Sequence, residues 1–131
     1  MALSDFSHEI PSEAFADSLR RAADYTWKEG LIIKGRNLCH GISGNGFSLL
    51  YHYHTSKDPK YLYYAARFAE FSLDSGVVAQ LLEDSDDLVD QFCSLLTGEL
   101  GHALFLSELL RAEQNNGCLF PGWSLFNFGS D

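Results

Sequence analysis

Residues 38–46 read Leu-Cys-His-Gly-Ile-Ser-Gly-Asn-Gly, and this stretch decides the fold. Three glycines within six positions indicate a turn where the backbone approaches other segments closely. Residues 47–54 are largely apolar, which predicts a buried helix entered from this glycine turn. A second glycine pair, Gly98 and Gly101, precedes another apolar segment, and we predict a helix over residues 95–111.

The two glycine pairs share one pattern. Gly41 and Gly44 have the same GxxG spacing as Gly98 and Gly101, and the two pairs lie 57 positions apart. That separation is the length of one helical hairpin repeat. The pattern predicts an outer helix, a GxxG turn and an inner helix, twice over. Two unrelated helices that each need glycine for close packing would give a similar pattern.

Two amphipathic helices are predicted over residues 13–29 and 59–75. The second has the clearer boundaries, because Asp58 is a good N-cap, Pro59 suits the first helical position, and Gly76 is expected to close the helix. With no segment typical of a strand, the fold class is all-α, and the 131 residues are interpreted as a single domain.

Composition excludes several classes of function. The chain carries 9 Lys and Arg against 18 Asp and Glu, a formal charge of -9, so it lacks the basic surface that nucleic acids require. The sequence has no apolar run long enough for a transmembrane helix and no typical signal peptide. We therefore expect a cytoplasmic protein, with peripheral membrane association as the other possibility. The acidic residues 83–87 lack the spacing of a calcium loop and are expected to face solvent.

Cys39 and His40 are adjacent residues of the two types that bind zinc best. Both could reach one ion only where the backbone is not helical, which the turn at Gly41 permits. Their spacing differs from that of common zinc motifs, so a buried cysteine beside a polar histidine is the alternative. The three cysteines of the chain do not suggest a disulfide framework.

The wider context of this pair resembles the lanthionine synthetase C-like family around its Cys-His-Gly motif. The resemblance covers about residues 30–126. The matching blocks are Cys39-His40-Gly41-x-x-Gly44-Asn45, Asp58-Pro59-Lys60-Tyr61-Leu62-Tyr63, Arg67-Phe68-Ala69-Glu70, the segment from Ser94 to Leu110 and Phe120-Pro121-Gly122.

The resemblance implies the C-terminal part of an α/α toroid, a double ring of helical hairpins whose GxxG turns line one mouth. It implies that Cys39 and His40 are two of three protein ligands of a zinc ion. The family adds a thiol to a dehydroamino acid to form a thioether, and the thiol is a peptide cysteine or glutathione. Lys34 matches a family lysine near the glutathione site, and a solvated surface lysine is the alternative. His102, beside Gly101, is a candidate proton donor facing the same mouth, and a partly buried, hydrogen-bonded core residue is the alternative.

Departures from the family limit these expectations. The third zinc ligand and the other acid-base residues of the family lie upstream of its Cys-His-Gly motif, and residues 1–38 contain no match to them. Thr97 stands where the family has a glutamate. We therefore expect a fragment or truncated member that binds zinc weakly or not at all and is inactive by itself. The alternative function is a non-catalytic scaffold or binding module. Either would expose one flank of the repeats and could self-associate through it.

Overall fold

The computed structural model describes residues 12–32, 34–83 and 93–114, and within these ranges all regular structure is helical. The elements are α2 (Ser12–Glu29), α3 (Ile42–Ser56), α4 (Pro59–Leu73), α5 (Ser75–Glu83) and α7 (Glu99–Glu113). The all-α prediction is therefore confirmed. Residues 84–87 of the acidic segment and the block at Phe120 lie outside the described residues.

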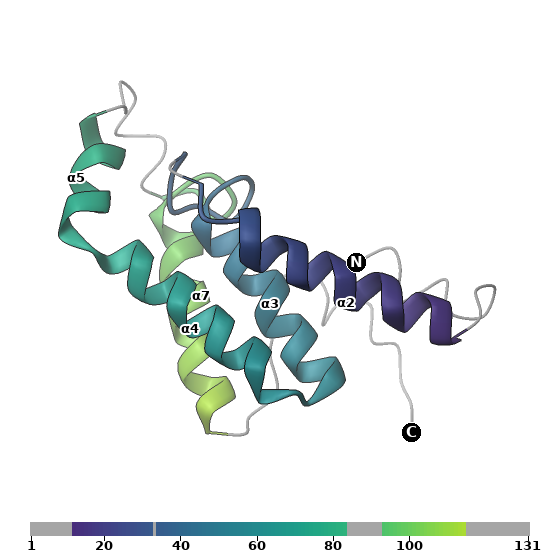
Figure 1. The fold of residues 1–131 in the computed structure, drawn as a ribbon. Coiled ribbons are helices and arrows are strands. Elements are labelled where there is room, and N and C mark those ends of the chain that lie inside the picture. The colour runs from purple at the N-terminus through teal and green to yellow at the C-terminus, as the bar shows by residue number, and fades with distance from the viewer. Residues whose placement is uncertain (1–11, 33, 84–92, 115–131) are drawn as a thin grey trace.

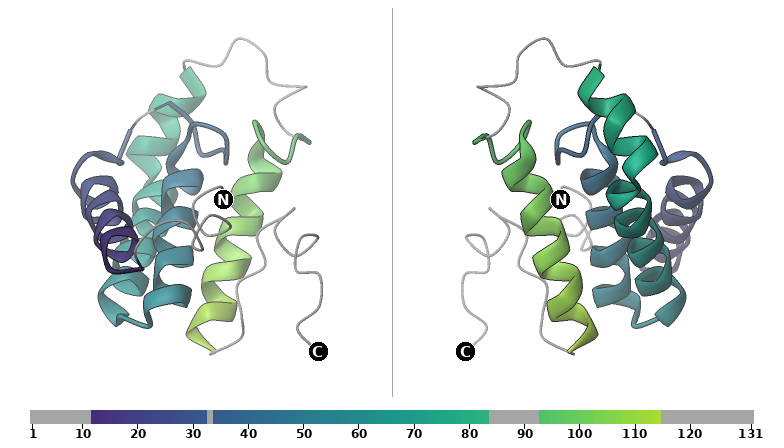
Figure 2. Two further views of the ribbon diagram at one scale, coloured as in Figure 1. Left: turned by 90° about the vertical axis from the view of Figure 1, so that its right-hand side faces the viewer. Right: turned by 90° about the vertical axis from the view of Figure 1, so that its left-hand side faces the viewer.

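The inner helices α3 and α7 pack side by side, and α2 and α4 lie on the outer side of α3 (Figures 1 and 2). Both inner helices begin at the same end of the molecule, each directly after the first glycine of its pair. Gly44 and Gly46 therefore lie inside α3, and not in a turn before the helix as predicted. This is the predicted order of outer helix, turn and inner helix, except that the additional helix α5 follows α4 in the second copy. Because α3 contacts α2, α4 and α7, it is the centre of the described structure.

The core lies where α3, α4 and α7 meet. Phe105 of α7 and Phe68 of α4 are fully buried, and the rings of Phe105 and Phe47 lie 5.6 Å apart, centre to centre. Burial of a side chain of this size contributes about 2–3 kcal/mol. Gly46 of α3 leaves room for Phe105, since a Cβ atom at residue 46 would lie only 2.3 Å from the ring. The apolar run 47–54 thus forms the buried helix expected from the sequence.

The ends of α4 and α7 differ from the predictions. Helix α4 does not continue to residue 75, because Asp74 has an extended backbone and ends the helix after Leu73. The Asp74 carboxylate then accepts hydrogen bonds from the backbone N–H groups of Gly76 and Val77, at 2.9 and 3.1 Å. Asp74 therefore caps a new helix, α5, and Gly76 lies in its first turn instead of closing α4. Helix α7 begins at Glu99, four residues later than predicted.

The described helices include none that is both long enough and apolar enough to cross a membrane.

Candidate functional site

The turns before α3 and α7 have the same backbone construction. Gly41, the N-cap of α3, has φ -104° and ψ -174°, and Gly98, the N-cap of α7, has φ -114° and ψ -176°. A Cβ atom on Gly44 would lie 2.1 Å from the Leu38 carbonyl oxygen, and one on Gly101 would lie 2.2 Å from that of Leu95. In each turn that carbonyl lies six positions before the glycine, so the two GxxG turns are structural equivalents.

A short polar side chain closes each turn in the same way. The His40 N–H donates to Oδ1 of Asn37 at 3.0 Å, and the Thr97 N–H donates to Oγ of Ser94 at 3.2 Å. Asn37 and Ser94 are 57 positions apart, which is the separation of the glycine pairs. The sequence pattern did not assign either residue to the closing of its turn, although Ser94 begins one of the matching blocks. The signal was present, since Asn and Ser commonly accept such local backbone hydrogen bonds in turns.

Cys39 and His40 lie next to each other on the first turn, and both side chains are exposed. The Cys39 N–H donates to the Leu96 carbonyl oxygen at 2.8 Å, which joins the two turns through their backbones. Nε2 of His40 lies 3.4 Å from the Asn37 amide nitrogen, so that side of the ring faces the turn. Lys34 is exposed at the start of the same turn.

These two residues meet the chemical requirements of a zinc ion only in part. A thiol and an imidazole on adjacent, exposed, non-helical residues are suitable donors. A protein zinc site usually has three or four such ligands, and the described part of the chain contains no group of three His, Cys, Asp or Glu that could hold a metal. Cys93 is also exposed, on the second turn, but it does not complete such a group. Cys39 and His40 thus fit two positions of an incomplete site.

An ion pair also joins the two turns. Arg36 and Glu99 make two contacts, Nη2 to Oε2 at 2.7 Å and Nε to Oε1 at 3.3 Å. Their side chains are 19% and 34% exposed, so the pair is shielded from solvent more than most surface ion pairs. Arg36 lies three residues before Cys39, and the pair therefore helps to hold the Cys39 turn against the start of α7.

His102 lies at the start of α7 but is buried, with 5% of its surface exposed. Its Nδ1 lies 2.9 Å from Oγ of Ser43, which is fully buried on α3. Burial lowers the pKa of His102, nearby Arg36 lowers it further, and Glu99 acts in the opposite direction. The lowered pKa favours the neutral ring, and Nε2 has no hydrogen-bond partner among the described residues. The structure brings His102 next to Ser43 and does not expose it beside Cys39.

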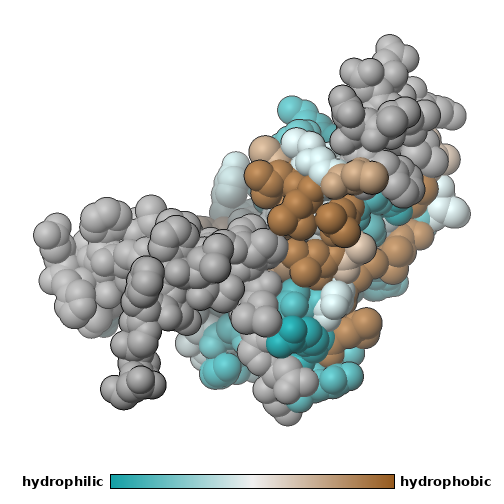
Figure 3. Space-filling model, turned by 180° about the vertical axis from the view of Figure 1, so that it is seen from behind, coloured by the Kyte–Doolittle hydropathy of each residue, from teal (hydrophilic) through white to brown (hydrophobic). Residues whose placement is uncertain are grey.

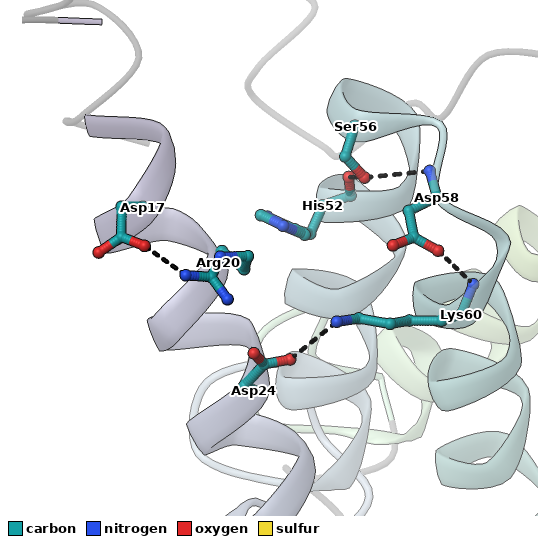
Figure 4. Close-up of polar contacts among 7 residues, drawn as sticks. All are labelled: Asp17, Arg20, Asp24, His52, Ser56, Asp58 and Lys60. Carbon is teal, nitrogen blue, oxygen red and sulfur yellow. Dashed lines mark hydrogen bonds and ion pairs between the residues drawn. The ribbon is translucent and has the colours of Figure 1, made fainter. Parts of the chain in front are cut away.

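A second polar cluster lies between α2, α3 and α4 (Figure 4). Lys60 of α4 pairs with Asp24 of α2 at 3.3 Å, and the Asp58 side chain accepts the Lys60 N–H at 3.0 Å. His52 of α3 is directed towards α2 and packs edge-on against the Tyr61 ring, 4.2 Å from its centre. The Lys60 pair joins α4 to α2, and the His52 contact joins α3 to α4, so neither involves the Cys39 turn.

Comparison with known proteins agrees with this construction. The family model of lanthionine synthetase C-like proteins matches residues 1–125. The chain is 32% identical over 97 residues to a protein of Danio rerio named glutathione S-transferase LANCL1, and this match covers 74% of the chain. It spans 22% of that relative's length. By these matches the chain belongs to the lanthionine synthetase C-like family.

Proposed function

We propose that this chain supplies two ligands, Cys39 and His40, to a zinc site of a protein that adds a thiol to a dehydroamino acid. The observation that supports it most directly is the exposed Cys39-His40 pair, held on a turn by contacts on both sides. Family membership and a relative named as a glutathione S-transferase support the choice of chemistry. When bound, zinc supplies a Lewis acid that lowers the pKa of a thiol.

The reaction is a simple addition. A bond forms between the thiol sulfur and the β-carbon of the dehydroamino acid, the carbon–carbon π bond breaks, and the thiol proton ends on the α-carbon. No oxidant or reductant is required. Glutathione or the cysteine of a dehydrated peptide would serve as the thiol, and the proposed compartment is the cytoplasm.

Two further residues have proposed roles in substrate handling. Lys34 is exposed five positions before Cys39, where its ammonium group would attract a carboxylate of glutathione. His102 remains the candidate for proton transfer. Burial lowers its pKa and favours the neutral ring, and substrate would reach it only if the Ser43 contact opened.

Metal titration of the 131-residue chain tests the proposal. Cobalt(II) is the probe, because coordination by a thiolate gives a sulfur-to-metal charge-transfer band. With two ligands instead of three or four, we expect binding on the order of micromolar instead of nanomolar or tighter. Cys39→Ala should abolish the band. Cys93→Ala is the matched control, since Cys93 is also exposed on a GxxG turn, and it should leave the band unchanged. Equal bands in wild type and Cys39→Ala would refute the ligand assignment.

The second candidate is a non-catalytic binding module. Two observations favour it: the metal ligands of the described residues are incomplete, and α7 exposes large apolar side chains, among them Leu100 and Leu110. In this function the glycine turns serve packing, and the exposed face serves contact with a partner. A chain that binds no cobalt but associates through α7 would favour this candidate.

A further inference from the structure

Asn37 lies three residues before His40, and its side chain contacts His40 twice. Oδ1 accepts the His40 backbone N–H at 3.0 Å, and the amide nitrogen Nδ2 lies 3.4 Å from Nε2 of the imidazole. Asn37 is buried, with 8% of its surface exposed. Gly35, at φ 137°, lies against the same amide, since a Cβ atom there would be 2.8 Å from Nδ2. The amide is therefore held by its surroundings as well as by His40.

The His40 N–H also decides which way round the Asn37 amide lies. Turning the amide by 180° would place its NH2 group against that N–H, so that two donors would face each other. Oδ1 thus stays on the backbone side, and Nδ2 is the atom that meets the ring. Because Nδ2 can only donate, Nε2 has to accept, and the neutral ring then carries its proton on Nδ1.

This tautomer matters for metal binding, because a metal needs a ring nitrogen with a free lone pair. The lone pair of Nε2 is directed to Asn37, and Nδ1 is protonated. We propose that Asn37 competes with the metal for His40, so that coordination requires the Asn37 contact to break. The inference rests on the proposed function, which makes His40 a ligand. At 3.4 Å the contact is a long hydrogen bond, so it should weaken binding a few-fold without preventing it.

The second GxxG turn shows that closing such a turn does not require an amide. Ser94, 57 positions after Asn37, accepts the Thr97 N–H at 3.2 Å, and the Thr97 hydroxyl also donates to it at 2.8 Å. Leu96 and Thr97 stand where the first turn has its cysteine and histidine. Figure 3 shows apolar side chains gathered on the side of the molecule where α7 lies. The amide donor thus belongs to the turn that carries the imidazole.

Nitrogen-15 NMR of the metal-free 131-residue chain measures the tautomer directly, at about pH 8, above the ordinary histidine pKa. Wild-type His40 should carry its proton on Nδ1. Asn37→Asp keeps the shape and one acceptor for the His40 N–H, but replaces the Nδ2 donor with a second acceptor, so the proton should move to Nε2. A wild-type His40 protonated on Nε2 would overturn the proposal. So would an unchanged tautomer in Asn37→Asp.

Asn37→Ser is a second variant, which avoids placing a carboxylate at this buried position. Ser94 shows that serine can close the equivalent turn. Because a hydroxyl can donate or accept, His40 should lose its fixed preference for the Nδ1–H tautomer. Far-UV circular dichroism checks that each variant keeps its helices. A folded Asn37→Ser variant that keeps this preference in full would show that Asn37 does not set the tautomer.

Cobalt(II) titration measures the competition. In Asn37→Asp, Nε2–H donates to a carboxylate and Nδ1 offers its lone pair, an arrangement that strengthens histidine ligands, so cobalt should bind on the order of tenfold to a hundredfold more tightly. Ser94→Asp is the matched control, because it adds the same charge to the neighbouring turn and keeps an acceptor for the Thr97 N–H. It should tighten binding by about fivefold or less. Equal gains in both variants would overturn the proposal, since charge alone would explain them.

The two measurements distinguish failure of this inference from failure of the proposed function. No cobalt band in wild type or in Asn37→Asp, with both tautomers as expected, would refute the ligand assignment and with it the competition. A band of equal affinity in wild type and Asn37→Asp that is lost in Cys39→Ala would leave the ligand assignment standing and overturn the role of Asn37.

Discussion

The two GxxG turns have the same backbone and different side chains. Both N-cap glycines are extended, and both turns use a short polar side chain to accept a backbone hydrogen bond three residues on. The positions equivalent to Cys39 and His40 are Leu96 and Thr97. The comparison indicates that glycine and Asn or Ser produce the turn, while the two residues before the first glycine decide whether it carries a cysteine and a histidine or a leucine and a threonine.

The largest expected effect comes from breaking the shared backbone. Gly44→Ala and Gly101→Ala each place a Cβ atom within about 2 Å of a carbonyl oxygen, as the distances of 2.1 and 2.2 Å show, so backbone has to move. We expect each to lower the free energy of unfolding by about 2–4 kcal/mol in urea denaturation. Gly76→Ala is the control, since a Cβ there lies 3.2 Å from a single Asp74 side-chain oxygen. Similar losses in all three variants would show that the close approach is not the cause.

A smaller effect is expected from the ion pair that joins the turns. A double-mutant cycle with Arg36→Gln and Glu99→Gln should give a coupling free energy of about 1 kcal/mol, because the pair is bidentate and partly shielded from solvent. The same cycle on the more exposed pair Arg67 and Glu70 should give less than about 0.5 kcal/mol. Loss of the pair should also speed the reaction of Cys39 with a disulfide reagent, measured with Cys93 replaced by Ser.

The smallest expected effect is a change in pH dependence. His102 has a pKa lowered by burial, so the unfolded chain binds its proton more readily than the folded chain does. The free energy of unfolding should therefore be highest at pH values above the ordinary histidine pKa of about 6.5, and it should fall as the pH drops below that value. His102→Gln should reduce this slope in urea titrations at several pH values.

The slope should not vanish, because burial also lowers the pKa values of His52 and His54, which contribute with the same sign. An unchanged slope in His102→Gln would contradict the assignment of a buried, neutral His102. A reduced slope in His102→Gln would sharpen the contrast between the two repeats. The residue equivalent to His102 in the first repeat is Asn45, which does not titrate and donates to the Gly30 carbonyl oxygen.

The sequence predicted the helices better than their boundaries. Asp58 and Pro59 start α4 as expected, but Gly76 does not end it, because Asp74 caps the following helix through its side chain. Leu73 of α4 is 57% exposed, while Tyr61 and Phe68 of the same helix are buried. The spacing of apolar residues in the sequence does not show which side of a helix packs against its neighbours, because that depends on where α3 and α7 pack.

The sequence alone determined the local backbone of this protein and the family to which it belongs. Both depend on features that span only a few residues: the glycine spacing, the N-cap Asp58 and the Cys39-His40 pair. Tertiary structure decided which polar groups meet. Arg36 and Glu99 are 63 positions apart, and Ser43 and His102 are 59 apart. They come together only because two equivalent turns pack side by side. Residues so distant in the chain give no local signal of their contact.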